Sequence, residues 1–110
     1  MSLNAYYSKS FADFFKDDLH EILKQLVYAG GKDPLQEKAW ETEISLLKEI
    51  LSPWKNETAQ ILFEYTIPRL AKRIDVVLLL RNIVFCLEFK VGEIQYLQNE
   101  RLVGYQMAFP

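Results

Sequence analysis

The sequence predicts one α+β domain in which two helices precede a three-stranded antiparallel sheet and a further helix follows it. Apolar residues recur at three- and four-residue steps over residues 10–29 and 34–51, a spacing typical of amphipathic helices. Residues 73–80 and 83–90 are instead runs of β-branched and aliphatic residues, and two polar residues separate them as in a β-hairpin. At 110 residues the chain is long enough for a single domain with one hydrophobic core.

Capping residues mark where the two N-terminal helices begin. Ser10 is the expected N-cap of the first helix, with Asp13 three residues later as its capping-box partner. Gly30 and the glycine after it end this helix. Asp33 is the expected N-cap of the second helix. Pro34 fits its first helical position, because proline lacks the N–H that this position leaves unbonded.

The remaining elements complete the expected architecture. Residues 61–67 show partial alternation and end at a proline, so they are expected to form the first of three strands in an antiparallel meander. Residues 93–108 carry apolar residues at helical spacing and are expected to form the last helix. We therefore expect one domain over residues 1–110, composed of a helical extension (1–33) and an incomplete αβββα core (34–110) that lacks a clear fourth strand.

The register of the expected hairpin brings two acidic residues together. If the two polar residues form its loop, Leu80 opposes Ile83. Further along the strands, Asp75 then lies opposite Glu88, and the other face of the hairpin pairs only apolar residues. A slip of one residue would place the two carboxylates on opposite faces. Opposed like charges destabilise a sheet unless something lies between them, and carboxylate oxygens suit Mg²⁺ or Mn²⁺.

Basic residues flank this acidic pair. In the same register Arg73 opposes Lys90, and Arg69 and Lys72 lie just before Arg73. One interpretation is a phosphate-binding cluster beside a metal site, because a local patch can attract phosphate while the whole chain is mildly acidic. Two simpler interpretations remain. One is a solvated basic turn, and the other is a salt-bridged quartet in which Arg73 and Lys90 neutralise the acidic pair.

One glutamate of the second helix is expected to point toward the core. Glu43 lies three residues after Trp40 and four before Leu47, and both of these belong to the apolar stripe. A carboxylate on the buried side of a helix requires a partner, because burying an unpaired charge is costly. The alternative is a boundary glutamate whose stem reaches water.

Composition argues against several classes of protein. The net charge of −2 disfavours a general nucleic-acid-coating protein, which is usually strongly basic. No apolar run is long enough to cross a membrane, and residues 1–7 lack the pattern of a secretory signal. The single cysteine, Cys86, is expected to be a core thiol, which fits a reducing cytoplasm. His20 has no second histidine or cysteine at ligand spacing, so no zinc site is expected.

The order of these residues resembles the PD-(D/E)XK, or restriction-endonuclease-like, nuclease superfamily. Asp75 matches the first motif, although Ile74 stands where proline is usual. Residues 88–90, Glu-Phe-Lys, match the (D/E)XK motif, and Glu43 matches the helix glutamate found in many members. The resemblance implies hydrolysis of DNA phosphodiester bonds, endo- or exonucleolytic, with Mg²⁺ or Mn²⁺ as cofactor.

One group within the superfamily is more similar still. The stretch from Phe63 to Leu79, taken with residues 88–92, looks like the N-terminal nuclease-like region of bacterial proteins that carry a helicase-type ATPase domain downstream. This resemblance implies a helicase-associated domain whose partner is DNA.

Within the resemblance each site residue has an implied role. The residues implied to act in catalysis or metal binding are Asp75, Glu88, Phe89 through its backbone carbonyl, Lys90 and Glu43. Those implied to contact the nucleic-acid backbone are Arg69, Lys72 and Arg73. The carboxylates and the carbonyl would hold the metal, while the lysine would orient the attacking water or stabilise charge on phosphorus.

Two departures from the family pattern leave a second hypothesis open. Residues 93–110 leave no room for the strand that members carry after their second core helix, and Arg101 stands where larger relatives carry a glutamine before Tyr105. The alternative function is a catalytically inactive nuclease-like fold that binds nucleic acid or protein, or a fragment whose activity belongs to a longer chain. An open sheet edge would also favour a homodimer or a missing downstream ATPase domain as partner.

Overall fold

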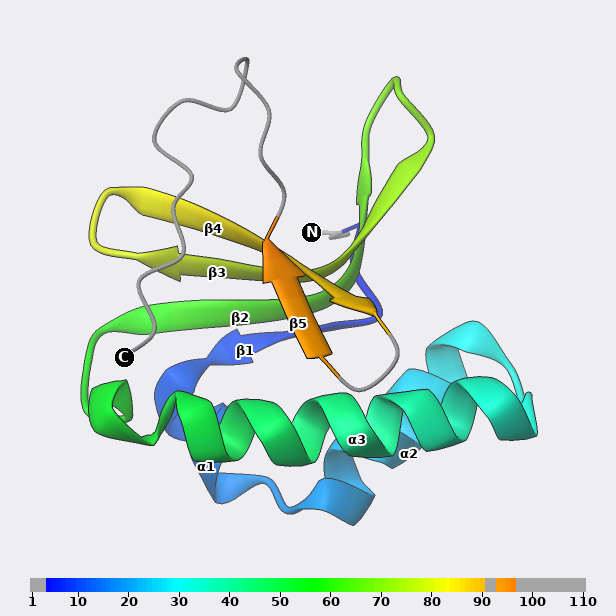
Figure 1. The fold of residues 1–110 in the computed structure, drawn as a ribbon, viewed down its shortest axis with the longest axis horizontal. Coiled ribbons are helices and arrows are strands. Elements are labelled where there is room, and N and C mark those ends of the chain that lie inside the picture. Colours follow the sequence, from blue (N-terminus) through cyan, green and yellow to red (C-terminus); the bar gives the residue numbers. More distant parts are fainter. Residues whose placement is uncertain (1–3, 91–92, 97–110) are drawn as a thin grey trace.

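Within residues 4–90 and 93–96, which the computed structural model describes, three helices lie on one face of a five-stranded antiparallel sheet (Figure 1). The helices are α1 (Phe11–Lys16), α2 (Leu19–Gly30) and α3 (Pro34–Ile50), and a short 3-10 turn, η1 (Ser52–Trp54), follows them. The strands are β1 (Tyr7–Ser10), β2 (Ala59–Ile67), β3 (Lys72–Leu80), β4 (Ile83–Lys90) and β5 (Glu93–Tyr96).

The sheet is a meander in the order β1-β2-β3-β4-β5. The predicted three-stranded meander is confirmed in β2, β3 and β4, and one further strand lies at each side of it. On one side β1 pairs with β2 from Tyr7↔Phe63 to Ser10↔Gln60. The sequence gives little sign of β1, because four residues with three polar side chains show no clear apolar alternation.

The predicted C-terminal helix is wrong where the structure describes it. Residues 93–96 form β5, which pairs with β4 from Lys90↔Glu93 to Leu87↔Tyr96. Without β5, the outer edge of β4 would present unpaired N–H and C=O groups. Residues 93–96 pair with this edge as a strand, although the apolar residues from 93 onward have helical spacing. The rest of that predicted helix, residues 97–108, lies outside the described residues.

The predicted hairpin register is confirmed over most of its length. β3 and β4 pair from Leu80↔Ile83 to Val76↔Leu87, so the loop between them contains two residues. The first of these, Arg81, takes a left-handed backbone conformation with φ 59°. This conformation is unusual for a residue with a side chain, and it supplies the reversal that glycine or asparagine usually provides in such loops.

The predicted first helix is two helices. Ser10 is the N-cap as expected, and its Oγ accepts a hydrogen bond from the backbone N–H of Asp13 at 3.1 Å. However, α1 ends at Lys16, and Asp18 caps a new helix by accepting from the N–H of Glu21 at 2.8 Å. Two adjacent aspartates at 17 and 18 favour this break, because aspartate competes with helical hydrogen bonds through its own side chain.

Helix α3 begins as the sequence predicts. Asp33 caps it by accepting from the N–H of Leu35 at 3.0 Å, and Pro34 occupies its first turn. Its buried face consists of Trp40, Glu43, Ile44 and Leu47. The prediction that Glu43 faces the core is therefore confirmed.

The main core lies between the helices and the sheet. Its largest side chains come from β1, the helices and the sheet together: Tyr7, Phe11, Phe14, Trp40 and Phe63. The buried polar or charged residues in the described part of the chain are Glu43 and Glu64. Both lie on this helix-covered side, so the core includes two carboxylates that its apolar packing does not require.

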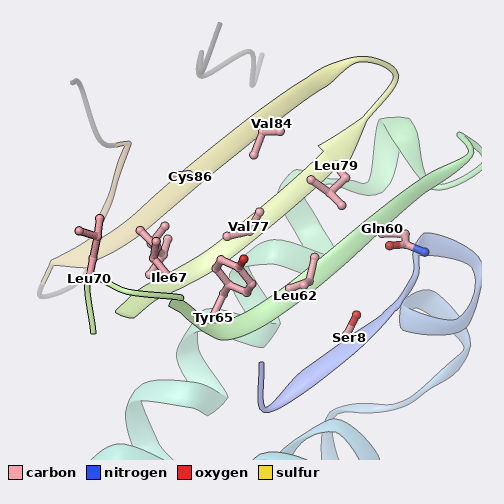
Figure 2. A pocket seen from close by; sticks show the side chains of 11 residues that line it. Ser8, Gln60, Leu62, Tyr65, Ile67, Leu70, Val77, Leu79, Val84 and Cys86 are labelled. Carbon is pink, nitrogen blue, oxygen red and sulfur yellow. The ribbon is translucent and has the colours of Figure 1, made fainter. Parts of the chain in front are cut away.

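The other face of the sheet has a second, smaller apolar cluster and a cavity of about 510 Å³ (Figure 2). Cys86 belongs to this cluster, so it is buried as predicted. The side chains lining the cavity are mostly apolar: Ser8, Gln60, Leu62, Tyr65, Ile67, Leu70, Ile74, Val77, Leu79, Val84 and Cys86. Among the described helices, none combines the length and the apolar character that crossing a membrane requires.

Candidate functional site

The candidate site begins at a backbone irregularity in β2. β2 and β3 pair without interruption as far as Phe63↔Val76 and pair again from Tyr65↔Ile74, and Glu64 and Asp75 fall between these pairs. Glu64 has φ 55°, a conformation that costs free energy for any residue with a Cβ. Such local strain in the middle of a strand commonly accompanies a functional site.

This irregularity changes which side chains face the helices. Before it, Ile61 and Phe63 belong to the core under the helices. After it, Tyr65 and Ile67 pack on the opposite face, although strict alternation would return them to the helix side. Glu64 thereby points toward α3, where a regular strand would have directed it to the other face.

Glu64 is held by two partners from two different elements. Its Oε2 accepts from the indole Nε1–H of Trp40 on α3 at 3.5 Å, and its Oε1 lies 3.3 Å from Nη1 of Arg73 on β3. The Arg73 guanidinium in turn lies over the ring of Tyr6, 5.1 Å from its centroid. Tyr6 packs edge-on against Trp40 with ring centroids 6.2 Å apart, which closes a ring of four residues.

Glu43 lies one helical turn from Trp40 and is the second buried carboxylate. It is 7% exposed, and its Oε1 is buried without a hydrogen-bond partner in the described part of the chain. Burial raises its pKa to about 8, with further contributions from the negative charges of Asp75 and Glu64. An acid with this pKa carries its proton at neutral pH unless a cation approaches it.

Asp75 connects this pair of glutamates to the hairpin. Its Oδ2 accepts a hydrogen bond from the backbone N–H of Phe89 at 2.9 Å. The Asp75 side chain therefore reaches β4 one step beyond Val76↔Leu87, where β3 turns away from β4 (Figure 1). The negative charge of Asp75 also raises the pKa of both glutamates.

Glu88 is placed differently from the other three carboxylates. On β4, Phe85, Leu87 and Phe89 all pack against the core under the helices. Glu88 alternates with them and is half-buried on the side where Cys86 lies. The negative charges that raise the pKa of Glu43 are Asp75 and Glu64. The structure thus brings Asp75 toward Glu43 and Glu64, whereas the hairpin register predicted that Asp75 and Glu88 share one face. The sequence did not indicate Glu64 as a member of this group.

The predicted basic residues separate into two groups. Arg73 makes its ion pair with Glu64, across the β2–β3 ladder. The salt-bridged quartet considered from the sequence would have used Arg73 to neutralise the hairpin carboxylates instead. Arg69 and Lys72 are exposed at the turn that joins β2 to β3, where Arg69 has φ 76°. Lys90 ends β4, and its side chain is not among the atoms that the structure describes.

The donor chemistry of this cluster fits a hard divalent cation. Carboxylate oxygens are the ligands that Mg²⁺ and Mn²⁺ prefer, and the Glu43 Oε1 is a buried oxygen that still lacks a partner. Within residues 4–90 and 93–96, no three or more histidine, cysteine, aspartate or glutamate side chains are already grouped as a complete metal site. Binding would therefore require side-chain rotation around Glu43, Glu64 and Asp75.

Comparisons of the chain with protein-family models, with curated proteins and with solved structures found no match. The resemblance to nucleases consequently rests on the motifs in the sequence.

Glu64, Trp40 and Tyr6 are members of the site that no pattern in the sequence indicated. Glu64 lies in a strand where alternation places it toward solvent, and no glycine or asparagine marks the irregular backbone there. Residues 61–67 carry an apolar or aromatic residue at every odd position and only Leu62 at an even one, so their alternation gives no sign of the break.

Proposed function

We propose that this chain is a nuclease-like domain of the PD-(D/E)XK type that hydrolyses DNA phosphodiester bonds with Mg²⁺ or Mn²⁺. The observation that carries the proposal is the unpartnered Oε1 of Glu43, buried beside the charges of Asp75 and Glu64. A buried glutamate beside two further carboxyl groups is costly for a fold even though Arg73 pairs with Glu64, and a divalent ion would relieve that cost. The sequence motif at Asp75 and at residues 88–90 supports the same chemistry.

The proposed roles combine the positions of the described side chains with the motif in the sequence. Glu43 and Asp75 would hold the metal, and the motif adds Glu88 and the Phe89 carbonyl as further ligands. Glu88, which lies on the other face of β4, would have to turn toward the cluster. When bound, the metal would polarise the phosphate and acidify a water molecule. The N–H of Phe89 orients the Asp75 carboxylate, whose charge acts on both buried glutamates. Lys90 would stabilise negative charge developing on phosphorus.

Cation binding can be tested apart from catalysis. We expect titration calorimetry with MnCl₂ to show saturable binding to the wild-type chain. Asp75→Asn and Glu43→Gln should each weaken it by about tenfold or more, because each removes a charged oxygen ligand. Glu41→Gln is the matched control, since Glu41 is exposed on the same helix. Equal Mn²⁺ affinity in all four proteins would contradict the proposed site.

Cleavage provides the second test. With Mg²⁺ or Mn²⁺ and plasmid DNA as substrate, Asp75→Ala, Glu88→Ala and Lys90→Ala should each reduce cleavage by about a hundredfold or more. Circular dichroism spectra should confirm that the variants remain folded. Unchanged cleavage in all three variants would rule out hydrolysis by this site.

A second candidate function has its own observation. Leu70 and Leu79 are 66% and 36% exposed and line the apolar cavity on the sheet face opposite the helices. Exposed apolar side chains beside such a cavity suit contact with another macromolecule. A nuclease-like fold without catalysis, acting as an interaction module, would show DNA or protein binding that is independent of Mn²⁺.

A further inference from the structure

Arg73 is fixed in position more firmly than its exposure suggests. Its side chain is 51% exposed, yet its guanidinium lies over the Tyr6 ring and pairs with Glu64, whose side chain is only 7% exposed. Trp40, itself buried, contacts both Glu64 and Tyr6. We call these four residues, Tyr6, Trp40, Glu64 and Arg73, the arginine bracket.

The bracket leaves part of the guanidinium available. A guanidinium carries five N–H donors in a planar fork, and the ion pair with Glu64 uses Nη1. The Tyr6 ring restricts the orientation of the fork, because the guanidinium carbon lies over the ring at 5.1 Å from its centroid. Among the described residues Glu64 is the acceptor that this guanidinium binds, so a half-exposed planar fork with further donors remains, which matches the geometry of a phosphate group.

The bracket also lies next to the carboxylate cluster. Glu64 belongs to both: Asp75 raises its pKa and Glu64 in turn raises the pKa of Glu43, while Arg73 binds Glu64 directly. A phosphate held by Arg73 would therefore sit at the edge of the cluster. In contrast, Arg69 and Lys72 are exposed at the β2–β3 turn.

We propose that Arg73 is the fixed phosphate-binding residue of this site and that Glu64 is a positioning residue, acting by holding the Arg73 guanidinium in place together with Tyr6 and Trp40. This inference rests on the proposed function and specifies which basic residue binds the DNA backbone. It assigns Glu64 a role that does not require contact with DNA or metal.

The sign of one mutational effect separates this role from a simple charge effect. Glu64→Gln removes a negative charge next to an anion-binding arginine, so electrostatics alone would strengthen DNA binding. If Glu64 instead positions Arg73, the same substitution weakens DNA binding, because the guanidinium loses its charged anchor. The amide oxygen of glutamine can still accept from Trp40, which limits the structural damage.

The experiment measures binding of a fluorescein-labelled DNA duplex to the full chain by anisotropy, in EDTA so that no cleavage occurs. We expect Arg73→Ala and Glu64→Gln each to raise Kd about tenfold. Both should also lower the slope of log Kd against log salt by about 1, the loss of one phosphate contact. Arg73→Lys should not restore affinity, because lysine lacks the planar fork.

Two controls carry matched charge changes. Glu41→Gln removes an exposed negative charge from α3, and Lys72→Ala removes the positive charge next to Arg73. Glu41→Gln should leave DNA affinity unchanged, whereas Lys72→Ala, which removes an exposed basic residue, should weaken DNA binding less than Arg73→Ala does. Thermal unfolding of each variant checks that Glu64→Gln remains folded at the assay temperature.

The outcomes distinguish the inference from the function on which it rests. Tighter DNA binding by Glu64→Gln, or equal losses in Lys72→Ala and Arg73→Ala, would overturn the bracket while leaving the nuclease proposal intact. Absence of DNA binding by the wild-type chain would contradict both the nuclease proposal and the proposed role of the arginine bracket. A loss shared by Arg73→Ala and Glu64→Gln, with a matching change in salt slope, supports the inference.

Discussion

At the scale of single residues, Glu43 should make the stability of this chain depend on pH. Its pKa is about 8 in the folded state, against 4.5 for an ordinary glutamate. Between these values the folded protein holds a proton that the unfolded chain has released, so stability falls as pH rises through this window. The slope for one such proton is about 1.4 kcal/mol per pH unit. Glu64, whose pKa burial also raises, adds to the same trend.

Urea unfolding at pH 5, 6, 7 and 8 in EDTA tests this prediction. Glu43→Gln should match the wild type at pH 5 and exceed its unfolding free energy increasingly up to pH 8, because glutamine stays neutral throughout. Glu41→Gln should follow the wild-type profile, since Glu41 is exposed. Parallel profiles for Glu43→Gln and wild type would show that Glu43 carries no raised pKa.

Glu64 shows where residue-level prediction fails and why. Strand assignment from alternation assumes a regular backbone, and the left-handed φ at Glu64 is imposed by the fold around it. Asp75 and Glu43 were accessible to prediction, because a hairpin register and a helical stripe are periodic patterns. A backbone irregularity at one residue produces no repeating pattern in the sequence, so the residues that contact Glu64 could not be inferred.

At the scale of elements, Lys48 connects α3 to the end of α1. Its ammonium donates to the backbone carbonyls of Phe14 and Asp17 at 2.5 and 2.7 Å, and it lies 4.5 Å from the centroid of the Phe14 ring. Carbonyls at a helix C-terminus lack intrahelical donors, so a cation there stabilises the break between α1 and α2. This contact explains how α1 can stop after six residues.

Replacing Lys48 tests this connection. Lys48→Met keeps the apolar stem and leaves the two carbonyls without their donor, so we expect a loss of about 1–3 kcal/mol in the free energy of unfolding. Lys38→Met removes the same charge from an exposed position of α3 and should have little effect. Urea unfolding at pH 7 measures both, and equal stability of the two variants would contradict the role of Lys48.

Element prediction from the sequence succeeded where long periodic segments or caps were present. Helix α3 and the strands β2, β3 and β4 each show such signals. The split between α1 and α2 depends on Lys48, which lies more than thirty residues along the chain from Phe14 and Asp17. Strands β1 and β5 are four residues each, and their formation depends on the edges that β2 and β4 offer. Short elements that are stabilised by residues far along the chain show few recognisable signals in their own sequence.

At the scale of the whole molecule, the helical layer and the sheet meet at the arginine bracket. Tyr6 lies just before β1, Trp40 on α3, and the other two members on β2 and β3. The end of α2 also contacts this group: a Cβ built on Gly30 would come within 2.5 Å of the Tyr6 ring and 3.1 Å of Trp40. A change in a helix remote from the hairpin can therefore reach the proposed phosphate-binding arginine.

Two adjacent glycines allow this coupling to be tested. Gly30→Ala should displace the Tyr6 ring, because 2.5 Å is below any real Cβ contact, and thereby loosen the support under Arg73. We expect its DNA Kd to rise severalfold in EDTA. Gly31→Ala has no atom within 4 Å of its new Cβ, but its φ of 93° strains any side chain, so it should cost about 1 kcal/mol of stability without changing DNA affinity. If the two variants lose DNA affinity equally, the loss reflects the lower stability of α2 alone. The contact between Gly30 and the arginine bracket would then have no effect on how Arg73 binds DNA.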